Sequence, residues 1–309
     1  MTHATIPFPT LSVILIFLAV QAAVAQPPEP SEPGEKLRLW EVHAIQRYRT
    51  RGGLRNGDGG MAWHESALGA SRGLFVPGPG LLRIGVDYSH TRFAFTRGVR
   101  HGPLGIEPFR VAEEVWLSAQ LVAPLTGTWS SQFFGAATSA FESGASSDDT
   151  FSGAGGLGVM RRFSRRLAIG IGALFQESLS DRAITGVPMV LLDWQVTDRL
   201  ALTSAQDVIL SYLLDPGRRL TVAATASFYE FKQFRLDAHG TLPGGVAEFR
   251  SFEVGGQLTW EPLPALTLDA RVEAALGQNL RMDDRGGKEM ADLDIEDALH
   301  LGLTLRYRF

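Results

Sequence analysis

Charged side chains recur at every second position within several otherwise apolar segments of the chain. In residues 267–277, for example, Asp269, Arg271 and Glu273 alternate with apolar residues. Side chains two positions apart on an extended strand point to the same face of a sheet. The residues that we expect to share such an inner face are Arg83, Asp87, Glu114, Asp193, Glu253, Asp269, Arg271, Glu273, His300, Arg306 and Arg308.

This set of charges allows two kinds of chemistry. Carboxylates and guanidinium groups lining a conduit can attract or filter a charged solute. The same groups can instead neutralise one another as salt bridges and fill a narrow interior. Asp269 and Glu273 come close to Arg306 and Arg308 if their strands are neighbours, which slightly favours paired charges. Both interpretations stay open on the sequence alone.

A catalytic site is the weaker hypothesis. An enzyme that works by nucleophilic catalysis needs a nucleophile with a base within reach. The segment His64–Ser66 precedes the first strand that we expect, and Ser89 and His90 point to opposite faces of theirs. His239 falls in a connection and His300 on the inner face. We therefore assign no catalytic residue and expect a protein that is not an enzyme.

Metal, cofactor and nucleic-acid sites are also not expected. The chain has no cysteine, which excludes disulfides and thiolate zinc sites. The acidic connection 278–297 offers oxygen ligands but lacks the spacing of a calcium-binding loop. The glycines of Gly153–Gly158 match a dinucleotide-binding pattern, but a strand follows them where that site needs a helix. The net charge of −4 makes nucleic acid an unexpected partner.

The elements that position the charged residues show the periodicity of β-strands. From residue 81 to the end, apolar residues recur at alternate positions in successive segments. In Ala298–Phe309, the apolar face carries Leu299, Leu301, Leu303, Leu305, Tyr307 and Phe309. We count about twelve such segments, an even number as in bacterial barrels. A soluble sandwich alternates in the same way, so periodicity alone does not decide the fold.

The connections between the segments alternate in length. Short ones fall at residues 124–128, 164–166, 197–199, 215–218 and 262–265. Longer ones fall at residues 97–109, 142–150, 178–184, 237–247 and 278–295. Short turns at one end and long loops at the other are typical of outer-membrane barrels. The connection near Gln206–Asp207 is too short for this pattern.

Aromatic residues bracket the apolar faces at two levels. Those that we expect at the membrane interface are Trp129, Phe151, Phe175, Trp194, Phe228, Phe252, Trp260 and Tyr307. Phe252 and Trp260 are eight residues apart, with Val254, Gly256 and Leu258 on the same face between them. A tilted strand of this length covers an apolar band about 25 Å tall. The expected fold is therefore an all-β, transmembrane, antiparallel up-and-down barrel.

The N-terminal part has the features of an export signal and a linker. Leu11–Val20 is an apolar run too short to span a membrane as a helix. Ala23–Ala25 follows it as a small-residue cleavage site, so we expect residues 1–25 to be a signal peptide. We expect residues 26–80 to be a Pro/Gly-rich linker and irregular extension, and residues 81–309 to form the barrel.

The closing strand HLGLTLRYRF, together with the signal and the turn pattern, resembles Gram-negative outer-membrane β-barrels. Residues 186–205 and 252–260 are similar to an exported barrel family of unknown function. The resemblance implies that outer-membrane lipids and lipopolysaccharide are partners. It also implies that the assembly machinery recognises the C-terminal strand through Phe309.

Porin-like passive passage of small solutes through a charged lumen is the expected function. A structural or adhesion-type barrel with a salt-bridged, closed lumen is the first alternative. A lipid-modifying outer-membrane hydrolase is the second.

Overall fold

The computed structural model describes residues 40–55, 59–76, 80–96, 108–145, 149–205, 207–215, 217 and 219–309. The expected signal peptide and about a third of the expected linker lie outside these residues. In this part of the chain there is no helix long and apolar enough to cross a membrane.

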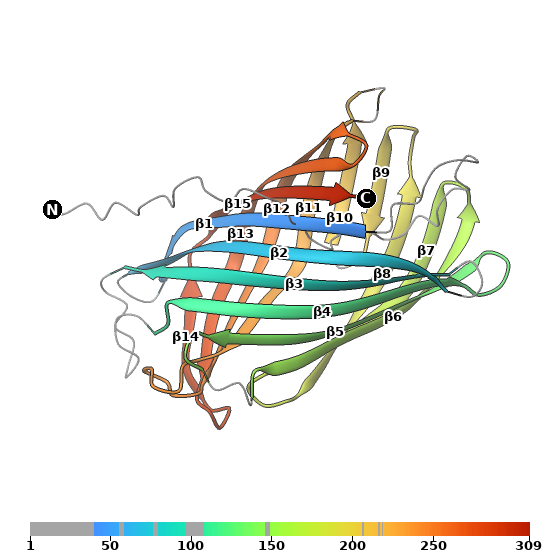
Figure 1. The fold of residues 1–309 in the computed structure, drawn as a ribbon. Helices are drawn as coiled ribbons and strands as arrows, with labels where there is room; N and C mark the ends of the chain where they lie inside the picture. Colours follow the sequence, from blue (N-terminus) through green and yellow to red (C-terminus); the bar gives the residue numbers. More distant parts are fainter. Residues whose placement is uncertain are drawn as a thin grey trace.

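The described residues form antiparallel strands joined in sequence order (Figure 1). The strands are β1 (Trp40–Gly53), β2 (Gly60–Val76), β3 (Gly80–Phe95), β4 (Val111–Pro124), β5 (Trp129–Glu142), β6 (Phe151–Ser164), β7 (Leu167–Glu177), β8 (Ile184–Gln195), β9 (Leu200–Ser204), β10 (Asp207–Leu213), β11 (Leu220–Arg235), β12 (Val246–Leu263), β13 (Leu266–Asp283), β14 (Glu289–Ile295) and β15 (Ala298–Arg308).

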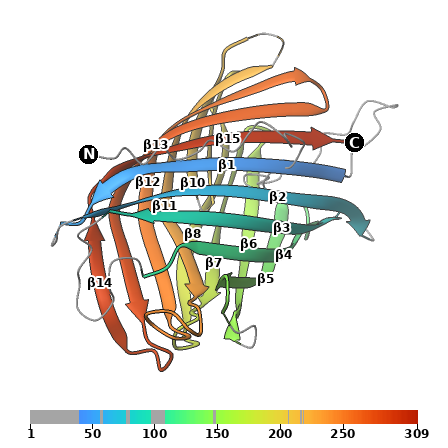
Figure 2. The same cartoon turned by 60° about the vertical axis from the view of Figure 1, so that its left-hand side comes forward.

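The sheet closes on itself because β1 pairs with β15, from Glu41 opposite Arg308 to Arg49 opposite His300. Two backbone hydrogen bonds between Trp40 and Phe309 extend this seam to the chain's last residue. Strands β14 and β15 both pair with β13. Strand β15 pairs with Leu266–Ala275 of β13, and β14 pairs with Gln278–Asp283 of β13. Figures 1 and 2 show how the strands follow one another around the wall. Because β14 and β15 share one position in the wall, the barrel has 14 strands.

The expected count of about twelve strands was wrong, and the two missing strands are β1 and β2. Both lie in the stretch that we expected to be an irregular extension. Their alternation is blurred, because β1 carries Ile45 on its buried face and Gln46 on its exposed face. Gln46 accepts a hydrogen bond from Ser66 of β2, which links two polar groups on the outer surface. Residues 81–309 are therefore most of the barrel wall, but not all of it.

The two faces of the wall differ as strand alternation requires. Large apolar side chains such as Leu157, Ile171, Val272 and Leu303 are exposed on the outside. Buried polar and charged side chains occupy the alternate positions, on the inside. An apolar exterior on a closed barrel suits contact with lipid, because every strand edge along the seam is paired.

The two ends of the barrel also differ. One end, here the short-turn end, carries the tight connections such as β6–β7 and β12–β13, together with Trp40 and Phe309. The other, here the long-connection end, contains an apolar cluster. Its buried members include Met61 and Trp63 of β2, Phe234 of β11 and Phe249 of β12. Phe109 and Leu242 enter the cluster from the connections β3–β4 and β11–β12.

Strand β11 bends into the interior near the long-connection end. A register shift between Ser227 and Glu230 interrupts its pairing with β12. Beyond this bulge, Arg235 forms a parallel bridge with Phe141 of β5, a strand from the opposite side of the sheet order. Lys232 consequently reaches residues of β2, β3 and β4. Phe234 packs in the apolar cluster.

Candidate functional site: the interior of the barrel

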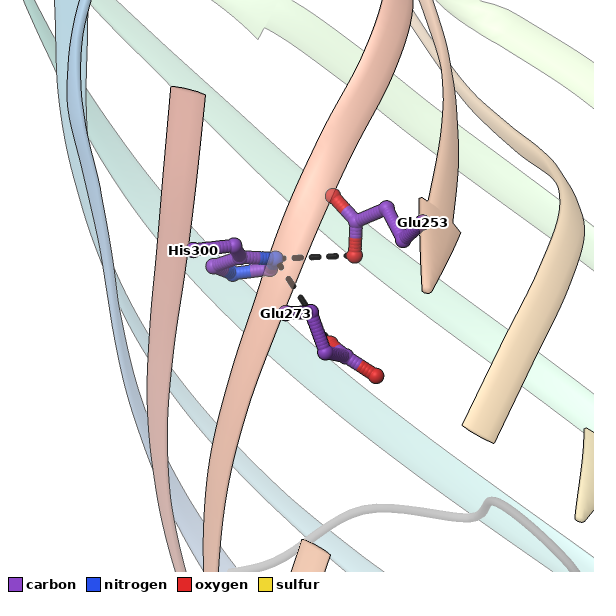
Figure 3. Close-up of side chains that lie close together, drawn as sticks. All are labelled: Glu253, Glu273 and His300. Carbon is purple, nitrogen blue, oxygen red and sulfur yellow. Dashed lines mark hydrogen bonds and ion pairs between the residues drawn. The ribbon is translucent and has the colours of Figure 1, made fainter. Parts of the chain in front are cut away.

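A cluster of charged side chains lies directly beneath the apolar cluster. His300 Nδ1 is 2.8 Å from Glu253 Oε2 and 3.9 Å from Glu273 Oε2, and all three side chains are buried (Figure 3). Thr225 donates a hydrogen bond of 2.8 Å to Glu273. Arg49 Nη2 lies 3.9 Å from Glu253 Oε1. Strands β1, β11, β12, β13 and β15 thus each contribute one residue to one buried group.

Arg49 is fully buried because aromatic rings cover it. Its guanidinium carbon is 4.5 Å from the ring centre of Phe249 and 5.7 Å from that of Trp63. Such cation–π contacts partly replace the water that a buried cation loses. The edge of the Trp63 ring also contacts His300, with 5.2 Å between ring centres. The aromatic residues therefore join the charged group to the apolar cluster.

Glu253, Glu273 and His300 are close enough to share a metal ion, since one ligand atom of each lies within 4.8 Å of the others. Arg49 changes the charge balance of this site. Arg49 places a positive charge beside Glu253, and the members of the group already bond to one another. The group is best described as a buried salt-bridge network.

A second group of charges crosses the interior. Lys232 Nζ of β11 donates hydrogen bonds of 2.9 Å to Glu65 of β2 and to Thr91 of β3. Glu114 of β4 lies 4.0 Å from the same ammonium. Arg47 of β1 is 4.0 Å from Glu65. One cation from the bent part of β11 therefore ties it to the opposite wall.

A third group lies nearer the short-turn end and pairs neighbouring strands. Arg306 of β15 donates a 2.7 Å hydrogen bond to Asp269 of β13, and Arg308 donates one of 2.8 Å to Glu41 of β1. His43 of β1 bonds to Asp87 of β3 across β2. The residue between them in register is Gly69, where a Cβ would lie 1.9 Å from the Asp87 carboxylate and 2.2 Å from the His43 ring. Glycine is thus required for this pair.

The structure places the predicted inner-face residues at different depths. Glu253, Asp269, Glu273 and His300 are buried, and the other seven are half-buried: Arg83, Asp87, Glu114, Asp193, Arg271, Arg306 and Arg308. Sequence reasoning missed several of their partners, namely Glu41, His43, Arg47, Arg49, Glu65 and Lys232. Five of these lie in β1 and β2, and the sixth follows the β11 bulge. The alternation of charged residues in Glu41-x-His43 and Arg47-x-Arg49 is the sequence pattern that could have indicated a strand with a polar inner face here.

The predicted interface aromatics lie mostly on the outer surface. Trp129, Phe151, Phe175, Trp194, Trp260 and Tyr307 are exposed there. Phe252 is half-buried, and the side chain of Phe228 lies outside the described residues. Phe309 is exposed and stacks on Trp40, with 6.5 Å between ring centres. The stacked rings cover the end of the β1–β15 seam.

The inner face of β6, β7 and β8 has a different character. Its residues include Ala154, Gly156, Gly158, Ala168, Gly170, Gly172, Leu174, Val187, Met189 and Leu191. In these three strands, all of whose residues the structure describes, only Arg162 and Asp193 carry charge on this face. Both lie toward the short turns. The interior is therefore charged along one part of its wall and small and apolar along another.

No protein-family model matches the sequence, and no curated protein matches it. Among solved structures, the chain is similar to the COG4313 outer membrane channel from Pseudomonas putida F1, at 11% identity and a TM-score of 0.49, covering 90% of this chain and 99% of that chain. It is also similar to the NanC porin, at 11% identity and a TM-score of 0.43, covering 87% of this chain and 100% of that chain. For the KdgM porin the identity is 9%, the TM-score 0.36, and the coverage 87% and 99%. The chain thus resembles outer-membrane β-barrel proteins.

Proposed function

We propose that this chain is an integral outer-membrane channel through which small solutes pass passively, as in a porin. The observation that carries the proposal is a closed barrel with an apolar exterior and a polar interior. A barrel that only anchored itself in lipid would need the apolar exterior but not the polar interior. Charges held inside such a wall set up a field that acts on solutes in the interior.

The paired charges reduce the open part of the interior but do not line all of it. The described pairs belong mainly to β1–β4 and to β11–β15. The inner face of β6–β8 carries mainly small or apolar residues, and Arg162 and Asp193 are its only charges. We therefore place the route for solutes along β6–β8, with the salt-bridged groups forming its opposite side.

As part of this proposal, the exterior contacts outer-membrane lipids and lipopolysaccharide, and the assembly machinery recognises the C-terminal strand. Catalysis has no place in the proposed function. The charged network of His300, Glu253 and Glu273 is used for structure and for the field it produces, with no bound cofactor.

Single-channel recording of the refolded chain in a planar lipid bilayer tests the proposal. We expect discrete conductance steps. Insertion is checked separately, by the heat-dependent gel mobility of a folded barrel. Protein that is inserted but electrically silent would contradict the channel and support a structural barrel with a closed lumen.

A pair of variants tests whether the steps come from this interior. Asp193→Asn removes a carboxylate from the proposed route, and Asp198→Asn removes one from the exposed β8–β9 turn. We expect the first variant to lower the permeability ratio of cations to anions and the second to leave it unchanged. Equal effects of the two would place the current outside the proposed route.

A further inference from the structure

The hairpin of β9 and β10 ends part of the way up the wall. Strand β9 has 5 residues and β10 has 7, whereas the neighbouring strands β8 and β11 have 12 and 16. Strand β9 pairs only with Leu192–Gln195 of β8, and β10 pairs with β11 only as far as Ser227. Within the described residues, Ile184–Leu191 therefore has a partner strand on the β7 side alone. The turn of the β9–β10 hairpin, near Asp207, is the connection that was too short for the sequence pattern.

The free edge of β8 exposes fewer polar backbone groups than an ordinary edge. Backbone bonds from Gln195 to Arg166 and from Ser178 to Ala183 bracket the β7–β8 ladder, whose register has no shift. In an antiparallel ladder, alternate residues bond to the same neighbour. The odd-numbered residues of β8 therefore bond to β7, and Gly186, Pro188 and Val190 turn their backbone groups to the free edge.

Two of the groups at this edge are already accounted for. Pro188 has no N–H to leave unpaired, and proline is characteristic of strand edges. The carbonyl of Val190 accepts a 3.2 Å hydrogen bond from the Ser204 hydroxyl at the tip of the β9–β10 hairpin. The edge is thus adapted to stay unpaired, in the way that natural sheets protect their edges.

The free edge lies at the depth of the apolar band. In the β7–β8 ladder Phe175 is opposite Gly186 and Leu167 is opposite Trp194, so the exposed aromatic rings mark both limits of the band. Backbone that is not paired within a membrane is tolerated where it borders protein or a cavity, but not against lipid chains. The edge between these limits must therefore border either protein or a space that solute or water can enter.

The backbone of β11 beyond Ser227 pairs with β12 and with Phe141 of β5, and in the described pairings it does not pair with this edge. Gln233 and Arg235 bond to the β7–β8 connection: Gln233 accepts from the Leu179 N–H at 2.8 Å, and Arg235 donates to the Leu179 carbonyl at 3.0 Å. These contacts form a cover at the long-connection end of the gap. Further along that end, the apolar cluster fills the interior.

Apart from Thr185 near the long-connection end, the side chains at the gap are apolar on both faces of β8. Val187 belongs to the inner face, yet 40% of its surface is exposed. Ile184 and Val190 belong to the outer face and are 73% and 62% exposed. The apolar inner face of β6–β8 thus continues through the gap to the lipid-facing surface. An apolar molecule would meet no charged residue of β8 between these two surfaces, because Asp193 lies nearer the short turns.

We propose that the gap between β8 and β11, above the β9–β10 hairpin, is a lateral opening through which a small apolar solute passes between the barrel interior and the membrane. This inference rests on the proposed channel function and assigns it a class of solute. A charged or strongly polar solute would lose its hydration on this path, whereas an apolar one gains by reaching lipid.

Lipid access to the inner face at the gap tests the opening directly. The chain has no cysteine, so single substitutions can be labelled with a bimane fluorophore without background. Val187→Cys places the label on the inner face at the gap. Ile171→Cys places it on the exposed outer face of β7, and Ala154→Cys on the inner face of β6, where both strand edges are paired.

In vesicles with brominated acyl chains, we expect the Val187 label to be quenched nearly as well as the Ile171 label, and the Ala154 label to be protected. A Val187 label as protected as that at Ala154 would overturn the lateral opening. If unsubstituted protein still conducts in the bilayer experiment, only the opening fails. If it is also silent, the channel proposal itself fails.

Uptake provides a second test. N-phenylnaphthylamine is a small apolar probe that fluoresces on entering membranes and that an intact lipopolysaccharide leaflet excludes. Cells that express the full chain are expected to take it up faster than cells without it. Val187→Trp, which fills the gap, should return the rate to that of cells without the protein, whereas Ile171→Trp should keep it raised. Equal rates for the two variants would contradict the proposed path.

Discussion

The two parts of the barrel wall are stabilised in opposite ways. Along β1–β4 and β11–β15, many inward side chains are long and charged, and they bond across neighbouring strands or across the interior. Along β6–β8, most inward side chains are apolar, several of them are glycine or alanine, and the strands approach each other closely. The first part is held by pairs of opposite charge, and the second by close contact of the backbones.

Glycine has a different use in each part. In the charged part, Gly69 leaves room for the bond between His43 and Asp87. In the apolar part, a Cβ on Gly170 would lie 2.1 Å from the carbonyl oxygen of Val159 on β6. A side chain blocks the first position and a backbone blocks the second, which has less freedom to move. The comparison indicates that removing a charge from the charged part destabilises the protein. Adding volume to the apolar part destabilises it as well.

Removing an interior cation that bonds a buried carboxylate is expected to have the largest effect. In Lys232→Met, the ammonium that bonds Glu65 and neighbours Glu114 is lost, and two carboxylates remain inside without it. Breaking a buried pair in this way costs about 3 kcal/mol or more of unfolding free energy. The measurement is urea-induced unfolding of protein refolded into lipid vesicles.

The matched control makes the same change in the other part of the wall. Arg162→Met removes a half-buried cation from the inner face of β6, and we expect a loss below about 1 kcal/mol, as for solvated charges. Adding Glu65→Gln to Lys232→Met should recover part of the stability. If both single variants lost equal stability, the charged network would not distinguish the two parts.

Adding volume to the apolar part is expected to have the next largest effect. Gly170→Ala forces a methyl group against the backbone of β6, which overpacks the wall and costs about 1–3 kcal/mol. Gly135→Ala on the outer face of β5 is the control, because a Cβ there would meet nothing within 4 Å. The same unfolding measurement applies. A Gly170→Ala protein as stable as Gly135→Ala would show that β6 and β7 can separate without cost.

Most of the fold follows from local patterns that the sequence displays. Alternation and the lengths of connections predict the strands from β3 onward except β14, because lipid on one side and polar interior on the other require a period of two. Strand β14 lies within the stretch 278–295 that we expected to be a long connection. Strands β1 and β2 were missed where this period is weak. Ile45 faces inward and Gln46 outward, and the outward polar group is accommodated only through its bond to Ser66.

The candidate site could be predicted only in part. Parity assigns Glu253, Glu273 and His300 to one face, but it cannot show that Arg49 joins them, since that depends on the pairing of the first and last strands. The inward position of Lys232 could not be predicted for another reason. The bulge after Ser227 shifts the alternation of β11, so the side chain of Lys232 reaches across the interior although unbroken alternation would place it on the outer face. The short Gln206 connection was noticed, but its meaning needed the neighbouring strands.

The smallest expected effect concerns a single hydrogen bond within the charged part. Thr225→Val keeps the shape of the side chain and removes the hydroxyl that donates to Glu273 at 2.8 Å. A hydrogen bond to a charged group contributes about 1.5–3 kcal/mol, so we expect a loss near the lower limit, since Glu273 keeps its contact with His300. Thr221→Val, on the same face of β11 nearer the short turns, controls for the substitution itself. If Thr225→Val were no worse than Thr221→Val, the carboxylate of Glu273 would be satisfied by other groups. The buried network would then be able to rearrange, whereas the predictions for Lys232→Met and Gly170→Ala assume that the wall does not move.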